Sequence, residues 1–172
     1  DLASADRVLE FSKDAYKTSG LTANEYMQTI TSFSASLIQG LEGNTQKAVY
    51  VSDMAIKDMS DNANKMGTDI SSIQSAYQGF AKQNYTMLDN LKLGYGGTKT
   101  EMERLLKDAE KISGVKYDIS NLADVYKAIH VIQTEMGITG TTMEEASKTI
   151  SGSTAMMKSA YGNLITGIAD RS

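Results

Sequence analysis

The feature that most constrains the fold of this chain is the complete absence of proline from its 172 residues. Average usage of about 5% would place roughly eight prolines in a chain of this length. Because proline removes a backbone N–H and clashes with the preceding turn of a helix, a chain without it can be helical almost everywhere. Alanine, methionine, lysine and glutamate are plentiful, and all four favour helices. The sequence therefore predicts an all-α protein.

Glycine marks the ends of the predicted helices, because it adopts the left-handed conformation in which helices commonly end. The helical patterns stop at Gly20, Gly43, Gly67, Gly97, Gly114, Gly140 and Gly152. Threonine followed three residues later by an acid predicts a capping box at Thr22–Glu25, Thr98–Glu101 and Thr141–Glu144, and a weaker one at Thr86–Asp89. Asp69 is a simple N-cap. These signals predict a multi-helix bundle of about eight helices joined by short glycine-marked turns.

Apolar residues recur at helical spacing between these glycines. The predicted stripes are Tyr26, Ile30, Phe33, Leu37 and Leu41; Ile70, Ile73, Tyr77 and Phe80; Leu122, Val125, Ile129, Ile132 and Met136; and Met157, Ala160, Leu164 and Ile168. Only residues 115–119 (VKYDI) alternate as a strand would, and without a partner strand we expect an extended connector. We expect residues 1–19 to form a leading helix or linker and residues 20–172 a single α-helical domain.

The segment 48–66 differs from the other predicted helices. Its predicted inner face is small or soft and consists of Ala48, Val51, Ala55, Met59 and Met66. Its predicted outer face alternates in sign every four residues and consists of Asp53, Lys57, Asp61 and Lys65. Neighbouring opposite charges at this spacing attract by about 0.2–0.5 kcal/mol per pair. The sequence therefore predicts a solvated face here rather than a binding surface.

The charge balance excludes several classes of protein. The chain holds 17 basic and 21 acidic residues without a basic stripe, so it does not predict binding to nucleic acid through phosphates. The absence of cysteine excludes disulfides and thiolate sites and fits a cytosolic protein. No apolar run approaches the roughly 18 residues of a membrane span. The N-terminus, DLASADRV, has no initiator methionine, and we expect the chain to be a piece of a longer one.

The loop Gly94–Tyr95–Gly96–Gly97–Thr98–Lys99–Thr100 is the strongest candidate for a phosphate site. A P-loop requires lysine directly after its last glycine and a strand before the loop. Here a threonine intervenes, and the preceding residues read as helix. We therefore predict a corner, turned by Gly96 and Gly97 and capped by Thr98 with Glu101. The residues expected to build it are Tyr77, Phe80, Tyr85, Leu88, Leu91, Gly94, Tyr95, Gly96, Gly97, Thr98, Glu101 and Leu105, with Tyr85 and Tyr95 pinning the connector to the bundle.

The other candidates for chemistry are isolated. His130 is the only histidine, and it lies at the edge of a buried stripe, where packing is the expected role. Ser113 and Lys116 match S-x-x-K but fall in a glycine turn without the further motifs of that enzyme class. The acidic positions near residue 60 lack the glycine and glutamate of a calcium loop. The sequence predicts no enzyme, no cofactor, no metal site and no small-molecule substrate.

The order of residues in three stretches of the chain indicates a protein family more specifically than the candidate sites do. Residues 58–106 read DMSDNANKMGTDISSIQSAYQGFAKQNYTMLDNLKLGYGGTKTEMERLL, preceded by GLTANEYMQTITSFSASLIQGL from Gly20 and followed by GVKYDISNLADVYKAIHVIQTEMGITGTTMEEASKTISGS from Gly114. These three stretches resemble the sequences of tail tape measure proteins of long-tailed bacteriophages and prophages of Gram-positive bacteria. The resemblance covers about Gly20 to Asp170.

The resemblance implies a structural role. Similar proteins set the length of the phage tail, template assembly of the tail tube with the help of tail assembly chaperones, and leave with the DNA on infection. It implies self-association, contact with tail tube protein and chaperones, and contact with DNA or membrane only during ejection. The implied locations are the lumen of the virion tail and the host cytoplasm during assembly. We expect this region to be a compact head beside an extended rod.

Two alternatives remain open. The first is a lytic or hydrolytic domain of a phage tail, of the peptidoglycan-hydrolase type, which would use His130 with a carboxylate such as Asp118 or Asp124. The second is a generic helical adaptor that binds one protein partner through a groove.

Overall fold

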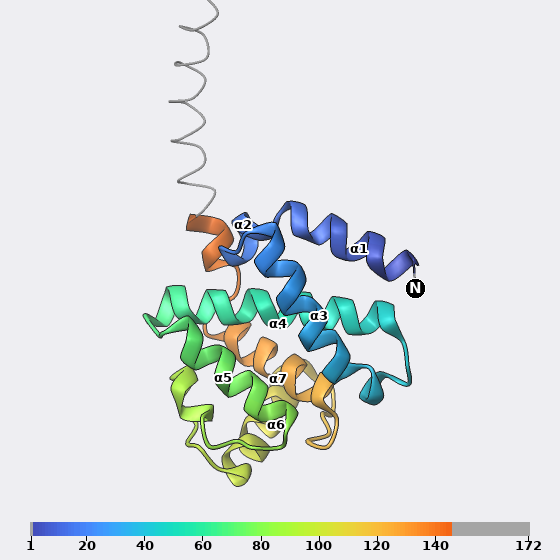
Figure 1. Ribbon diagram of the computed structural model, residues 1–172. Helices are drawn as coiled ribbons and strands as arrows, with labels where there is room; N and C mark the ends of the chain where they lie inside the picture. The colour runs from blue at the N-terminus through green and yellow to red at the C-terminus, as the bar shows by residue number, and fades with distance from the viewer. Residues whose placement is uncertain (1, 146–172) are drawn as a thin grey trace, which may run out of the picture.

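A 22-residue helix, α4 (Thr45–Met66), runs through the middle of the bundle (Figure 1). The structure is a computed structural model that describes residues 2–145. The other helices in chain order are α1 (Leu2–Lys13), α2 (Ala15–Ser19), α3 (Ala23–Leu37), the 3-10 helix η1 (Gln39–Leu41), α5 (Ile70–Ala81), the 3-10 helix η2 (Leu88–Leu91), α6 (Lys99–Ser113) and α7 (Leu122–Glu135). A further helical stretch begins at Thr141. The described residues contain no strand, and the predicted all-α bundle of about eight helices is confirmed.

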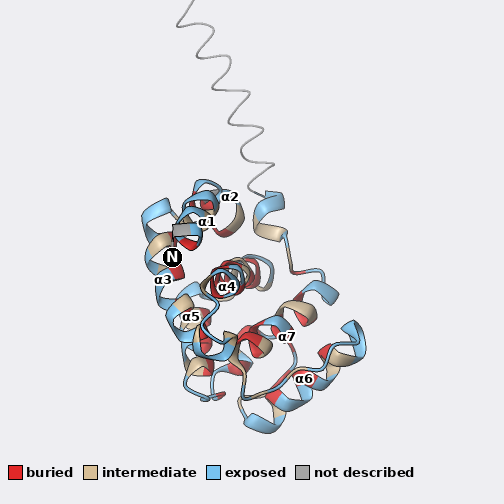
Figure 2. Cartoon of the chain, turned by 90° about the vertical axis from the view of Figure 1, so that its right-hand side faces the viewer, coloured by how far each residue is buried: buried red, intermediate tan, exposed pale blue. Residues whose placement is uncertain are grey.

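Helix α4 has neighbours on most of its surface. It contacts α1, α2, α3, α5 and α7, while α6 packs on α7. In Figure 1, α1 and α2 lie on one side of α4, and α5, α6 and α7 lie on the other. Figure 2 shows the buried positions of these helices facing the centre of the bundle. Within residues 1–19, expected to lead into the domain, residues 2–19 contain α1 and α2, and Ala15 is fully buried in the shared core.

The predicted stripes supply about a third of the buried apolar residues. Tyr26, Ile30, Phe33 and Leu37 of α3 are buried, as are Ile73, Tyr77 and Phe80 of α5 and Val125, Ile129 and Ile132 of α7. Two terminal members are wrong: Ile70 at the start of α5 is 39% exposed and Met136 at the end of α7 is 44% exposed. The terminal members Leu41 and Leu122 are only partly buried. Residues 115–118 lie outside any helix or strand, and Ile119 lies in a turn. The stripe from Met157 to Ile168 lies outside the described residues.

The caps are confirmed in part. Thr22 and Glu25 form both bonds of a capping box, Thr98 accepts from Glu101 N, and Asp69 accepts from Ser71 N. The box at Thr86–Asp89 is wrong, because η2 begins after Met87, which makes no side-chain cap. Asn44 and Asn121 cap α4 and α7, and neither was predicted.

The predicted cap at Thr141 is also wrong. Its hydroxyl donates to the backbone oxygen of Ile138 at 2.8 Å instead of accepting from the next turn. The backbone N–H groups at this helix start are bound by Asp61 of α4, which is distant in sequence. A tertiary contact thus replaces the local cap.

Five of the predicted glycine turns have the left-handed conformation that glycine favours. Their φ angles are 69° at Gly20, 76° at Gly43, 66° at Gly67, 74° at Gly114 and 87° at Gly140. Gly152 lies outside the described residues.

Candidate functional site

The residues predicted to build the corner between α5 and α6 lie together. Tyr77, Phe80, Leu88, Leu91 and Leu105 are each 2% exposed or less. Tyr85 and Tyr95 of the connector are also buried. The Tyr85 ring stacks on Phe80 with centroids 6.2 Å apart, and the Tyr95 hydroxyl donates to Asp108 of α6 at 2.6 Å. These contacts hold the connector against the bundle on both sides.

The connector also bends before the predicted pair Gly96 and Gly97. Gly94 has a φ of 93°, and Lys92 is left-handed at 54°. Gly97 is required for a different reason: a Cβ there would lie 2.1 Å from the backbone oxygen of Thr86. At Gly96 a Cβ would meet only the Glu101 side chain, with Cγ at 3.6 Å and Oε1 at 3.7 Å. Thr98 N donates to Gly96 O at 3.0 Å across Gly97, so the chain turns at the predicted pair, and Gly97 also allows two backbone segments to touch.

Glu101 fills the loop that resembled a phosphate site. Its Oε1 accepts from Gly96 N at 3.1 Å, its Oε2 accepts from Arg104 Nε at 2.6 Å, and Arg104 also donates to Gly94 O at 2.8 Å. The bonds from Arg104 and from the Gly96 N–H lower the pKa of Glu101 to about 2. A carboxylate of the chain thus takes the backbone donor that a phosphate would need. The loop is a structural corner.

Three carboxylates of α4 are buried, contrary to the predicted solvated face. Asp53, Asp58 and Asp61 are 5%, 1% and 2% exposed. The prediction assumed that α4 has a free side, whereas helices and the segment after α7 cover it. Lys57 makes the expected ion pair with Asp53, at 2.7 Å.

Each buried carboxylate joins α4 to a different element. Asp53 accepts from the Tyr26 hydroxyl of α3, and Asp58 meets His130 of α7. Asp61 accepts from Gly140 N at 2.8 Å and from Thr142 N at 2.9 Å. Because an unpaired buried charge is costly, these partners are what allow the acids to be buried.

A buried amide pair adds a second connection between the same helices. Asn62 donates to Gln133 Oε1 at 2.8 Å and to Leu91 O at 2.9 Å, and Gln133 donates to Asp58 O at 3.0 Å. Both side chains are fully buried. The network ties α4 to α7 and to the end of η2. The sequence offered one signal for this buried network, which is the polar residue Gln133 on the predicted core face beside Ile132.

His130 has a carboxylate partner that the sequence did not reveal. Its Nδ1 lies 2.9 Å and 3.0 Å from the two carboxylate oxygens of Asp58. The bond to Asp58 raises the pKa of His130, and burial raises the pKa of Asp58 to about 6. Asp118 and Asp124, the partners considered for a lytic enzyme, instead contact each other at the start of α7 through Asp118 N and Asp124 Oδ2.

An Asp–His pair of this kind can orient a general base. Nucleophilic catalysis would also need a hydroxyl bonded to the second ring nitrogen, and no described side chain supplies one. Ser113 donates to Ala109 O, so its S-x-x-K match has a local structural role.

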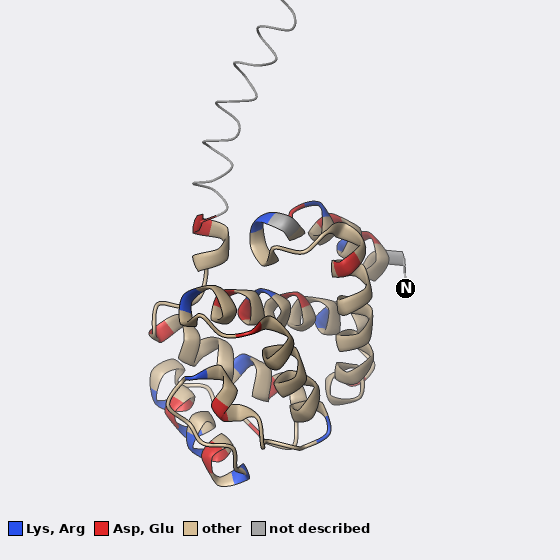
Figure 3. Ribbon diagram, turned by 60° about the vertical axis from the view of Figure 1, so that its left-hand side comes forward, with Lys and Arg blue, Asp and Glu red and all other residues tan. Residues whose placement is uncertain are grey.

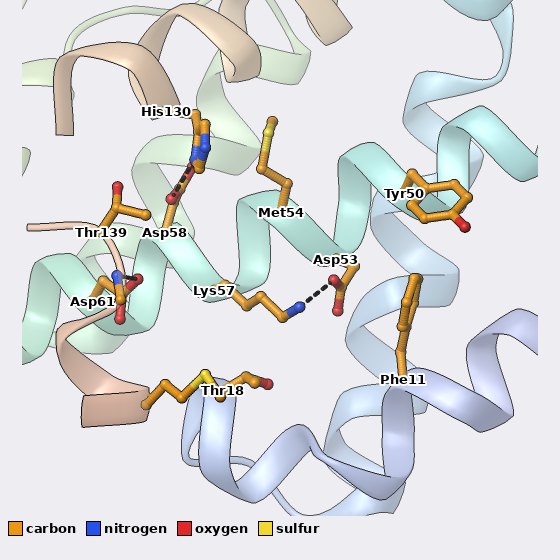
Figure 4. A pocket seen from close by; sticks show the side chains of 12 residues that line it. Phe11, Thr18, Tyr50, Asp53, Met54, Lys57, Asp58, Asp61, His130 and Thr139 are labelled. Carbon is orange, nitrogen blue, oxygen red and sulfur yellow. Dashed lines mark hydrogen bonds and ion pairs between the residues drawn. The ribbon is translucent and has the colours of Figure 1, made fainter. Parts of the chain in front are cut away.

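An apolar cleft of about 420 Å³ opens beside this pair (Figure 4). Its walls include Phe11 of α1, Tyr50 and Met54 of α4, and Met143 after α7, with His130 at one end. Phe11 and Tyr50 meet edge to face with centroids 5.4 Å apart, and Lys57 lies 5.5 Å from the Phe11 ring centroid. The cleft has the shape and chemistry of a binding site for an apolar group.

Other kinds of site find little support in the described part of the chain. Residues 2–145 contain no group of three or more metal-ligating side chains placed to hold an ion. No helix in that range is long and apolar enough to cross a membrane. Figure 3 shows acidic and basic positions interspersed along the helices.

Comparisons of the chain with protein-family models, curated proteins and solved structures found no match.

Proposed function

We propose that this chain is a structural, non-enzymatic region of a tail tape measure protein of a long-tailed bacteriophage or prophage. Its role is to support assembly of the tail tube and to contribute to the setting of tail length. Its proposed partners are other copies of itself, the tail tube protein and tail assembly chaperones. The proposed locations are the host cytoplasm during assembly and then the lumen of the virion tail.

The observation that carries the proposal is the resemblance of residues 58–106 to that family of proteins. The geometry supports a structural role for the same stretch. It runs from the second half of α4 through α5 and the corner into α6. Contacts between α4 and other elements are made within it by Asp58, Asp61 and Asn62. Glu101 accepts a backbone hydrogen bond in the glycine loop.

The experiment is an in-frame deletion of residues 20–145 in the phage or prophage that encodes the chain. Tails are purified, probed with an antibody against this region, and measured by electron microscopy. We expect the wild-type region in purified tails, and tails of the deletion mutant that are absent, shortened or variable in length. Absence of the region from intact tails, together with normal tails in the mutant, would contradict the proposal.

A lytic domain is the second candidate, because the Asp58–His130 pair borders an open cleft. Zymography on bacterial cell walls separates the two functions. A zone of clearing that the wild-type chain produces and His130→Ala does not would favour the lytic domain. A helical adaptor would instead capture a host protein in preference to tail tube protein.

A further inference from the structure

The cleft is lined mainly by apolar side chains, several of them exposed. Tyr50 is 47% and Met143 is 52% exposed, and Phe11 and Met54 are partly exposed beside them. Figure 4 shows Tyr50 and Met54 on α4 and Phe11 on α1 among the side chains that line the cleft. An apolar cleft with a few polar groups at its edge can accept an apolar side of another segment.

The charged groups around the cleft are mainly acidic. Asp53, Asp58 and Asp61 of α4 face it together with Lys57 of the same helix and His130 of α7. Three carboxylates against one lysine leave a negative balance even when His130 is protonated. The surface therefore favours an occupant that is apolar on one side and carries positive charge.

The chain itself contains such a segment after its last described residue. Residues 146–172 hold Lys148, Lys158 and Arg171 against Asp170, a net charge of +2. Since the whole chain carries −4, residues 1–145 carry −6. The same segment contains the apolar stripe Met157, Ala160, Leu164 and Ile168. Charge and apolar character both complement the cleft.

The length of the stripe agrees with the length of the cleft. Met143 lines the cleft, and Met157 follows it by 14 positions, a span of up to about 45 Å for extended chain. As a helix, a stripe from Met157 to Ile168 would be about 17 Å long at 1.5 Å per residue. The wall of the cleft on α4, from Tyr50 to Asp61, has the same length by the same rise.

We propose that the cleft between α1, α2 and α4 is the docking site for residues 157–168 of the same chain, which lay their apolar stripe along Phe11, Tyr50, Met54 and Met143. The mode is that of an amphipathic helix in an apolar groove. This inference is independent of the proposed function.

Cross-linking of the full chain tests the proposal directly, because the chain has no cysteine of its own. The test pair is Met54→Cys with Leu164→Cys. The control pair is Lys99→Cys with Leu164→Cys, since Lys99 is exposed on α6, on the other side of α4. Under mild oxidation we expect an intramolecular disulfide to form at least tenfold faster in the test pair. Equal rates would overturn the proposal, and so would disulfide-linked dimers only, which would assign the cleft to a second copy.

The single histidine provides a second readout that needs no cross-link. His130 borders the cleft, so its ring C–H signal in the proton NMR spectrum reports on the occupant. We expect Leu164→Asp to shift this signal and Asn163→Asp, which adds the same charge off the stripe, to leave it in place. An unchanged signal in both variants, or an equal shift in both, would overturn the proposal.

Discussion

His130 of α7 and Asp58 of α4, 72 residues apart in the chain, form a buried hydrogen-bonded pair in which Nδ1 lies 2.9 Å from the nearer carboxylate oxygen. The side chain of Asp58 is 1% exposed, whereas that of His130 is 36% exposed and borders the cleft. The pair therefore joins α4 to α7, and its histidine is in contact with solvent.

This pair should make stability depend on pH. The bond to Asp58 raises the pKa of His130 above 6.5, so the stabilisation is fully present below pH 6.5 and is lost as the pH rises through the raised value. Burial raises the pKa of Asp58 to about 6. The free energy of unfolding therefore also falls as the pH rises from about 4 to about 6. Urea unfolding from pH 5.5 to 9 should show a falling midpoint for the wild type. The midpoint of His130→Gln should fall less over the same pH range. Parallel plots of midpoint against pH for the two proteins would contradict the role of the pair.

Asp61→Ala should destabilise the bundle. The change leaves Gly140 N and Thr142 N without their carboxylate acceptor, and hydrogen bonds to charged groups contribute about 1.5–3 kcal/mol each. We expect a loss of about 3 kcal/mol or more in the free energy of unfolding and faster hydrogen exchange at those two amides. Asp89→Ala, at an exposed position, is the control. Unchanged exchange at Gly140 and Thr142 would show that Asp61 does not hold this segment.

Thr98→Ala should remove the N-cap of α6. Its hydroxyl accepts from Glu101 N at 3.1 Å, and such caps contribute about 1 kcal/mol. Thr100→Ala, in the exposed first turn of the same helix, should change the free energy of unfolding by less than about 0.5 kcal/mol. Equal midpoints for the two variants in chemical denaturation would count against the cap.

Gly97→Ala should be far more disruptive than Gly96→Ala. The added Cβ at position 97 would lie 2.1 Å from Thr86 O, which is backbone and cannot rotate away. Overpacking of this kind costs about 1–3 kcal/mol or more. At position 96 the nearest atom is a flexible glutamate side chain at 3.6 Å. Thermal unfolding of both variants checks the difference, and a tolerated alanine at 97 would refute the close approach.

The expectation of a compact head beside a rod is tested by the size of the chain in solution. A folded chain of 172 residues has a radius of gyration of about 16 Å. Small-angle X-ray scattering should give a value near this one. A value several times larger would mean that the helices open into an extended rod.

The elements of this protein follow from interactions that are local in the sequence. Thr22 and Glu25 cap α3 because they are three residues apart, and the stripe from Tyr26 to Leu37 is buried because its members share one helix face. Gly67 and Gly114 end their helices because glycine adopts a positive φ without steric cost. Such features require no knowledge of the neighbouring helices, and so they were predictable.

The residues around the cleft required the tertiary structure. Whether Asp53 and Asp61 face water depends on how many helices surround α4, and the charge spacing along one helix does not contain that information. The partner of His130 is one of many carboxylates until the fold places Asp58 beside it. By itself the sequence determined the helices and their caps, because those depend on residues a few positions apart. Only the packing of α4 against its neighbours decided which acids are buried, because burial depends on contacts between segments far apart in the chain.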